Sequence, residues 1–142
     1  MMRTFLIGGS LAAAMLALAV LVAGSAQGKI SEGETRPLKT KTLMGKVVGP
    51  NCSGIAEGLK AEKIDWAALH GNAELLNECS YIIMDDKRCP DETWAGASKT
   101  LRECSDVLLK KLEAEDAEGA KTAFKALTES CGACHKAHKP KK

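Results

Sequence analysis

Side chains at every third or fourth position are apolar along four stretches of this chain, residues 43–59, 69–83, 94–112 and 120–138. This spacing places them on one face of an α-helix, and no stretch has the strict alternation of a half-buried strand. Four such helices must bury their apolar faces against one another, so the pattern predicts an all-α domain. The residues on the four faces are Leu43, Met44, Val47, Val48, Cys52, Ile55, Leu59; Leu69, Ala73, Leu76, Cys79 (or Ser80), Ile83; Trp94, Ala97, Leu101, Cys104, Leu108, Leu112; Ala120, Phe124, Leu127, Cys131, Cys134 and His138.

Helix-capping and helix-breaking residues separate these stretches. Asp65 is placed to cap the second helix, Pro90-Asp91 to begin the third, and residues 115–119 to divide the third from the fourth. Pro50 predicts a kink or a split in the first helix, because proline lacks the N–H that a helix interior needs. Four helices joined by short links within residues 37–142 pack most simply as an antiparallel four-helix bundle.

Residues 1–26 have the pattern of a secretory signal peptide. Arg3 is followed by an apolar run over residues 5–23 and then by the small residues 24–26. The run is also long enough for an uncleaved membrane anchor, which is the alternative. Residues 27–36 are a polar linker. We expect an exported domain, in the periplasm or an equivalent compartment, with no stable membrane insertion once the signal is cleaved.

Charge excludes one large class of function. The formal net charge is only +2, so the chain lacks the positive field that nucleic-acid binding requires. No nucleophile–base pair and no pair of carboxylates stands out, and we therefore do not expect an enzyme. Six cysteines in 142 residues are the feature that points to chemistry.

The segment Cys131-Gly132-Ala133-Cys134-His135 has the C-x-x-C-H spacing of covalent haem attachment. Two thiols three residues apart on a helix reach two vinyl-derived carbons of one porphyrin, and the next residue presents its imidazole to the iron. We expect one haem c per chain, held by Cys131 and Cys134, with His135 as an axial ligand. Two alternatives use the same residues: a dithiol redox motif, which normally follows a strand, and a zinc site of Cys131, Cys134 and His138.

Several segments in order match one family, and they are Leu43-Met44, Lys63-Ile64-Asp65, Pro90-Asp91-Glu92-Thr93-Trp94, Ala123-Phe124 and the motif itself. With them the chain resembles the class II c-type cytochromes, the cytochrome c-prime and cytochrome c-556 family, over about residues 37–139. The resemblance implies a four-helix bundle with one covalent haem, often as a homodimer. The chain departs from the family at Thr40, where Arg is frequent, and at His138-Lys139, where an aromatic residue and Arg are usual.

The residue that faces the iron opposite His135 separates two functions in that family. The resemblance places Met44 there. A thioether ligand suits one-electron transfer with periplasmic redox partners, which is the function we expect. If Met44 only fills the core, a five-coordinate iron would bind a diatomic gas such as NO or CO. A further alternative is a helical binding module that carries no haem and is held by disulfides.

Four further cysteines are not part of the family pattern: Cys52, Cys79, Cys89 and Cys104. In an exported protein they predict disulfides, although small buried hydrophobic side chains are an alternative. Cys79 and Cys104 lie at similar distances from the turn between the second and third helices, so they would be level across an antiparallel pair. Cys52 and Cys89 would then remain. We expect His138 at the surface or beside the iron ligand, and not on the iron.

Overall fold

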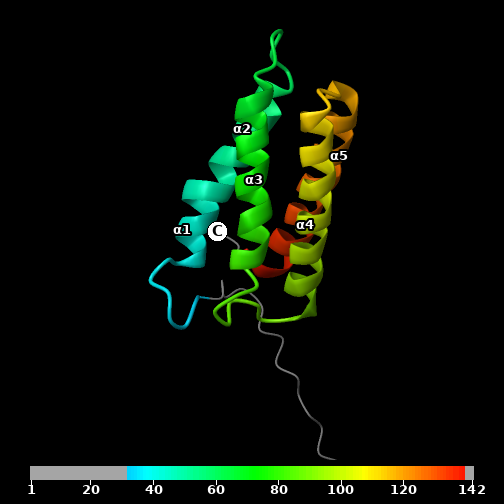
Figure 1. The fold of residues 1–142 in the computed structure, drawn as a ribbon. Helices are drawn as coiled ribbons and strands as arrows, with labels where there is room; N and C mark the ends of the chain where they lie inside the picture. Colours follow the sequence, from blue (N-terminus) through cyan, green and yellow to red (C-terminus); the bar gives the residue numbers. More distant parts are fainter. Residues whose placement is uncertain (1–31, 140–142) are drawn as a thin grey trace, which may run out of the picture.

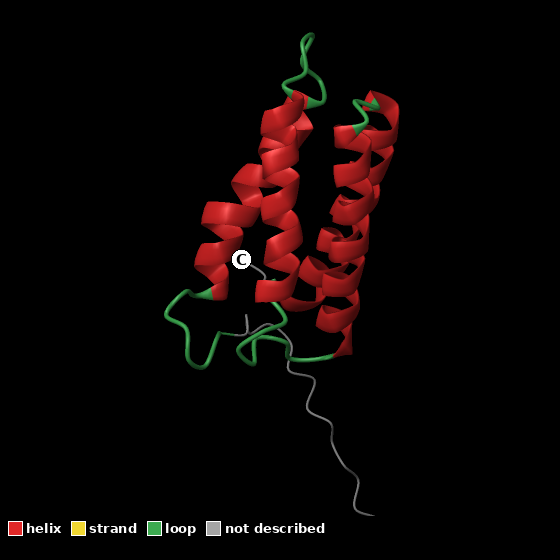
Figure 2. Cartoon of the chain, in the orientation of Figure 1, coloured by secondary structure: helices red, strands yellow, loops and turns green. Residues whose placement is uncertain are grey.

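The computed structural model describes residues 32–139, which form an antiparallel bundle of helices (Figure 1). The described residues contain no strand, which confirms the predicted all-α four-helix bundle (Figure 2). The expected signal peptide and half of the expected linker, residues 27–31, lie outside the described residues. The elements are α1 (Thr40–Leu43), η1 (Met44–Val48), α2 (Gly49–Gly58), α3 (Trp66–Ile82), α4 (Glu92–Glu113) and α5 (Ala117–His138).

The first helix of the bundle is interrupted near Pro50, as the sequence predicts. It consists of α1, the π-helical turn η1 and α2. The Gly49 N–H donates to the Met44 carbonyl, five residues earlier, which is the wider hydrogen-bond spacing of a π-turn. A Cβ at Gly49 would lie 3.2 Å from the Met44 oxygen, so glycine leaves room for this turn. The wide turn therefore begins at Met44, the residue that the sequence singles out as a second iron ligand.

Aspartates begin the three long helices. The side chains of Asp65, Asp91 and Asp116 accept hydrogen bonds from the backbone N–H three residues later, at 3.0, 2.9 and 2.9 Å. Each bond satisfies an N–H that the first turn of a helix leaves without a partner. The starts at Asp65 and Asp91 confirm the prediction. The break between α4 and α5 is shorter than the predicted residues 115–119, because Glu115 turns the chain with a φ of 54° and Asp116 already caps α5.

The bundle is not packed evenly. Helix α4 packs along both α3 and α5, and α2 packs on α3, but contact between α2 and α5 is sparse. Polar side chains help to join α3 to α4, since Asn77 Nδ2 donates to Ser105 Oγ at 2.9 Å. The buried apolar residues are Leu43, Val48, Ile55, Leu59, Leu69, Ala73, Leu76, Cys79, Ile83, Trp94, Leu101, Leu108, Leu112, Ala120, Ala123 and Leu127.

The predicted disulfides are absent: Cys52, Cys79, Cys89 and Cys104 are free thiols, as are Cys131 and Cys134. Cys79 and Cys104 lie at nearly the same height along α3 and α4, as predicted. The hydrogen bond from Arg102 Nε to Ser80 Oγ, which crosses the α3–α4 contact beside them, shows this alignment. The rotation of α3 and α4 about their own axes differs from the prediction. Ser80 and Ser105 occupy that contact, while Cys79 faces a cavity lined by η1 and α5, and Cys104 lies near Glu129 of α5.

A buried ion pair fastens residues 33–38, called here the strap, to the loop between α3 and α4. Arg88 is 1% exposed, lies 3.3 Å from Asp86 and donates to the Leu38 carbonyl at 2.8 Å. Asp86 accepts from both the hydroxyl and the N–H of Thr35, at 2.6 and 2.8 Å. These hydrogen bonds, above all that of the Thr35 hydroxyl, lower the pKa of Asp86 to about 2. Neither Asp86 nor Arg88 was singled out by the sequence pattern.

Candidate functional site

All four residues predicted to hold a haem iron and its porphyrin line one cavity inside the bundle. Met44 enters it from η1, and Cys131, Cys134 and His135 enter it from α5. The cavity is narrow, about 40 Å³. The remaining lining residues are mostly apolar and come from η1, α3, α4 and α5; they are Val48, Cys79, Ile83, Ala97, Ser98, Leu101 and Ser130.

The register of α5 directs the motif toward the cavity. Ala120, Ala123, Leu127 and Ser130 form the buried face of the helix. Cys131 and Cys134 lie beside that face and are partly buried, three residues apart on the same side of the helix. Two thiols thus reach the cavity from a single helix, as the spacing predicts.

The two motif thiols are electrostatically different. The pKa of Cys131 is lowered, mainly by a hydrogen bond from the Cys52 thiol and also by one from Ser130. Burial raises the pKa of Cys134 to about 11, with the negative charges of Cys131 and Asp91 adding to the effect. Since a thiolate is the nucleophilic form of cysteine, Cys131 is the more reactive thiol of the motif.

His135 lines the cavity but remains exposed to solvent. Partial burial of its imidazole lowers the pKa, and the Lys139 ammonium lowers it further. The ring is therefore neutral at pH 7, and a neutral imidazole nitrogen is the form that binds a metal ion. Met44 is half-buried on another wall of the same cavity, with a thioether that is a soft ligand suited to haem iron.

His138 was expected either at the surface or beside the iron ligand; it is buried, so the first of these expectations is wrong. It is 5% exposed, and its ring meets the Trp94 ring edge-on with 5.2 Å between centroids. Its Nε2 lies 3.3 Å from Asp91 Oδ1, the atom that also caps α4. His138 therefore joins the last turn of α5 to the first turn of α4 and does not line the cavity. Because it faces α4, it is also poorly placed to share a metal with the motif.

Cys52 is a site residue that the sequence pattern did not assign. Its thiol is hydrogen-bonded to Cys131, and this bond and burial raise the pKa of Cys52. The only signal in the sequence is its position on the apolar face of the first helix. This position predicts that the Cys52 side chain points into the bundle, but it does not predict contact with Cys131.

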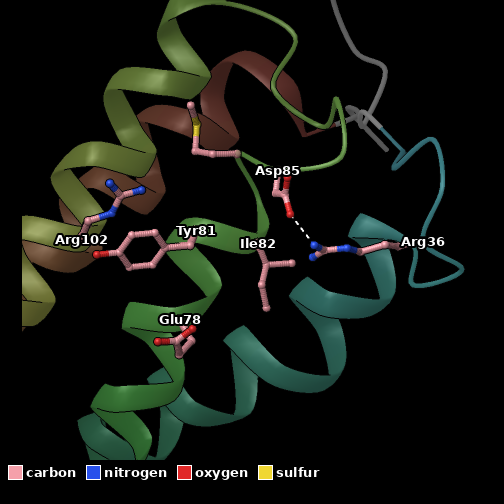
Figure 3. A pocket seen from close by; sticks show the side chains of 7 residues that line it. Arg36, Glu78, Tyr81, Ile82, Asp85 and Arg102 are labelled. Carbon is pink, nitrogen blue, oxygen red and sulfur yellow. Dashed lines mark ion pairs between the residues drawn. The ribbon is translucent and has the colours of Figure 1, made fainter.

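A second and larger pocket, of about 520 Å³, lies where the end of α3 meets the strap and α4 (Figure 3). None of the predicted site residues lines it. Its two arginines already have partners, since Arg36 pairs with Asp85 and the Arg102 guanidinium lies 3.7 Å from the centre of the Tyr81 ring. We therefore place the functional site in the narrower cavity at the motif.

Two further findings concern residues 32–139. No three His, Cys, Asp or Glu side chains in this range gather closely enough to hold a metal ion, which removes support from the zinc alternative. In the same range, each helix is too short or too polar to cross a membrane.

Comparison with known proteins supports the fold. The bundle is similar to the solved structure of a cytochrome c′ with an unusual ligand-controlled dissociation of its dimer, with a TM-score of 0.59 and 16% sequence identity. The match covers 72% of this chain and 92% of that one. No protein-family model and no curated protein matches the sequence. At this identity the likeness establishes a shared four-helix architecture and not membership of the family.

The residues at the cavity fit a covalently attached haem. Two thiols and an imidazole from one helix, a thioether from another wall and an apolar lining form the donor set that haem c requires. A porphyrin is larger than this cavity, so binding requires its walls to move apart. Contact between α2 and α5 is sparse, so these two helices can separate with little loss of packing.

Proposed function

We propose that this chain is an exported c-type cytochrome that transfers single electrons, with one haem attached to Cys131 and Cys134. The observation that carries the proposal is the convergence of Met44 and the C-x-x-C-H motif on one apolar cavity, in a bundle similar to a cytochrome c′. When bound, haem iron supplies a one-electron change of oxidation state whose potential depends on its axial ligands and surroundings.

Each residue has a defined part in this proposal. The thiols of Cys131 and Cys134 would hold the porphyrin by thioether bonds, and the neutral imidazole of His135 and the thioether of Met44 would bind its iron. Apolar side chains such as Val48 and Leu101 exclude water from the site. His135 is exposed to solvent, and we propose that a partner protein approaches the site there.

The cellular setting is part of the proposal and follows from the sequence. Residues 1–26 direct export and are then removed, so that the domain meets redox partners in the periplasm or an equivalent compartment. We also propose that the chain forms homodimers, as the resemblance implies. The cytochrome c′ with a similar fold is described as a dimer whose dissociation depends on a ligand. The protein is proposed to be a carrier and not an enzyme.

A second candidate function is the binding of a diatomic gas at a five-coordinate iron. It is favoured by the apolar neighbours of Met44 in the cavity, Val48, Ile83 and Leu101, because a cavity lined in this way admits a small neutral ligand. In that case Met44 packs against the core without binding the iron.

Visible spectra of the purified exported protein test both functions. We expect a sharp low-spin spectrum after reduction that carbon monoxide does not change, and Met44→Ala should make the iron high-spin and responsive to carbon monoxide. Met84→Ala is the matched control, because Met84 packs against the core without lining this cavity. A high-spin, carbon-monoxide-sensitive wild type would establish the gas-binding function instead. A chain without covalently bound haem would refute both.

A further inference from the structure

A second sulfur donor lines the cavity and has no part in the proposed function. Cys79, on α3, is 2% exposed and faces the same cavity of about 40 Å³ as Met44 and His135. Its thiol forms no disulfide, and within residues 32–139 it makes no side-chain hydrogen bond. A buried polar group without a partner requires an explanation. Its place beside the proposed iron ligands indicates one.

Few side chains on the walls away from His135 can bind iron. Those walls are formed by η1, α3 and α4, and their hydrocarbon side chains are Val48, Ile83, Ala97 and Leu101. The Ser98 hydroxyl is occupied, because it donates to the Trp94 carbonyl at 2.8 Å. Among the described residues, Met44 and Cys79 are therefore the two sulfur donors that reach the cavity from a helix other than α5.

We infer that Cys79 and Met44 exchange as the ligand opposite His135, with the Cys79 thiolate on ferric iron and the Met44 thioether on ferrous iron. Both kinds of sulfur are established haem ligands in proteins. The inference rests on the proposed function, because it requires that His135 holds a haem iron in this cavity. It adds a ligand from a third helix and couples each electron transfer to a movement of Met44.

The exchange balances in electrons, protons and bonds. When a redox partner takes one electron from the iron, the bond from the Met44 thioether to the iron breaks. The Cys79 thiol gives its proton to water, and its sulfur forms a bond to the iron. When a partner returns the electron, the bond from Cys79 breaks, the thiolate takes a proton from water, and Met44 binds again. The partners of the proposed function supply and accept the electron, so no further reagent is needed.

The apolar lining of the cavity favours a different donor in each oxidation state. The centre of a ferric porphyrin carries one positive charge and that of a ferrous porphyrin carries none, and an unbalanced charge is costly in apolar surroundings. A thiolate balances the ferric charge, whereas a neutral thioether leaves the ferrous centre neutral. Without iron a thiolate is unfavourable at this position, since burial raises the pKa of Cys79 to about 11 and the nearby charge of Glu78 adds to the effect.

The packing of the two donors suits an exchange in which Met44 moves and Cys79 stays in place. Cys79 belongs to α3, which packs against both α4 and α2. Met44 begins the π-turn η1, in an interrupted helix whose contact with α5 is sparse. Segments with few buried contacts open at lower free energy. The Met44 thioether can therefore leave the cavity without unpacking the helix that carries Cys79.

The experiment compares the oxidised and reduced forms of the full chain, exported with its haem attached. Magnetic circular dichroism and electron paramagnetic resonance identify the ligand pair of ferric iron, and proton NMR detects a methionine bound to ferrous iron. We expect histidine–thiolate ligation in the oxidised wild type and histidine–methionine ligation in the reduced wild type. Cys79→Ala should lose the thiolate signature and have a higher reduction potential, because an anionic ligand stabilises ferric iron. Cys104→Ala is the matched control and should behave as the wild type, since Cys104 is a partly buried free thiol that does not line the cavity.

Met44→Ala separates this inference from the proposed function. Its reduced iron should be high-spin, but its oxidised iron should remain low-spin, and replacing both Met44 and Cys79 by alanine should make the iron high-spin in both states. Histidine–methionine ligation in the oxidised wild type, or high-spin oxidised Met44→Ala, would overturn the inference and leave the haem proposal intact. A chain without covalently bound haem would refute both. The wild type and Met44→Ala decide the question with Cys79 unaltered, so the result does not depend on whether Cys79→Ala folds.

Discussion

Replacing Asp91 by alanine tests how the end of the bundle that carries the motif is held together. One oxygen of this carboxylate accepts the Trp94 N–H at 2.9 Å and lies 3.3 Å from His138 Nε2. Loss of an N-cap costs about 1 kcal/mol. The Asp91 side chain is 47% exposed, so solvent screens its contact with the His138 ring, and the contact adds about 0.5 kcal/mol when that ring is protonated. We expect Asp91→Ala to lower the free energy of unfolding by about 1.5 kcal/mol.

The chain offers a matched control for this substitution. Asp65 caps α3 by the same kind of bond, at 3.0 Å, and within the described residues it makes no ion pair. Asp65→Ala should therefore lose only the cap contribution of about 1 kcal/mol. Urea unfolding of the holoprotein, followed by circular dichroism, gives both values. Equal losses in the two variants would refute the reasoning, because they would show that the contact with His138 adds no stability.

Three further substitutions test local features of the fold. Since the pKa of Asp86 falls from an ordinary 3.8 to about 2 on folding, its stabilising contribution is present above about pH 4 and is lost as the pH falls toward 2. The rate at which pepsin cleaves the strap of the wild type, divided at each pH by the rate for Asp86→Asn to cancel the pH dependence of pepsin itself, should therefore rise over that range. A ratio that does not change with pH would contradict this. Gly71→Ala, in open space on α3, should raise the free energy of unfolding by up to about 1 kcal/mol. Gly49→Ala should bring no gain, because its Cβ would crowd the Met44 carbonyl at 3.2 Å; equal gains in the two variants, measured by urea unfolding, would show that the π-turn imposes no constraint.

The features that local sequence determines were predictable. Asp65 and Asp91 cap helices because their carboxylates reach an N–H three residues away, and that interaction needs no tertiary information. The apolar period of each helix sets which side faces the core. The period also places Met44 and the motif cysteines on inward-facing sides of their helices, whereas the expectation that Met44 lies opposite His135 came from the resemblance; the structure brings these residues to one cavity.

Features that depend on the rotation of one helix against another were not predictable. Ser80 lies at the α3–α4 contact, and rotating α3 about its axis by the angle between two consecutive residues would put Cys79 there instead. The apolar pattern allows either residue to face α4. The same limit explains why Cys52 was not matched with Cys131. The buried pair Asp86 and Arg88 was missed for another reason, because charged residues in a loop normally remain in solvent and only the overlying strap buries them.

The uneven packing of the bundle predicts that the two sides of the cavity differ in stability. His135 belongs to α5, which packs along α4 and is joined to it through His138 and Asp91. Met44 belongs to a helix interrupted by a π-turn, which packs on α3 and touches α5 sparsely. Local opening should therefore expose the Met44 side first, since segments with few buried contacts open at lower free energy. We expect amides of α2 to exchange with solvent faster than those in the middle of α4 and α5 in the native holoprotein. Exchange at a single rate throughout the bundle would contradict this reasoning and would mean that the Met44 side opens only with global unfolding.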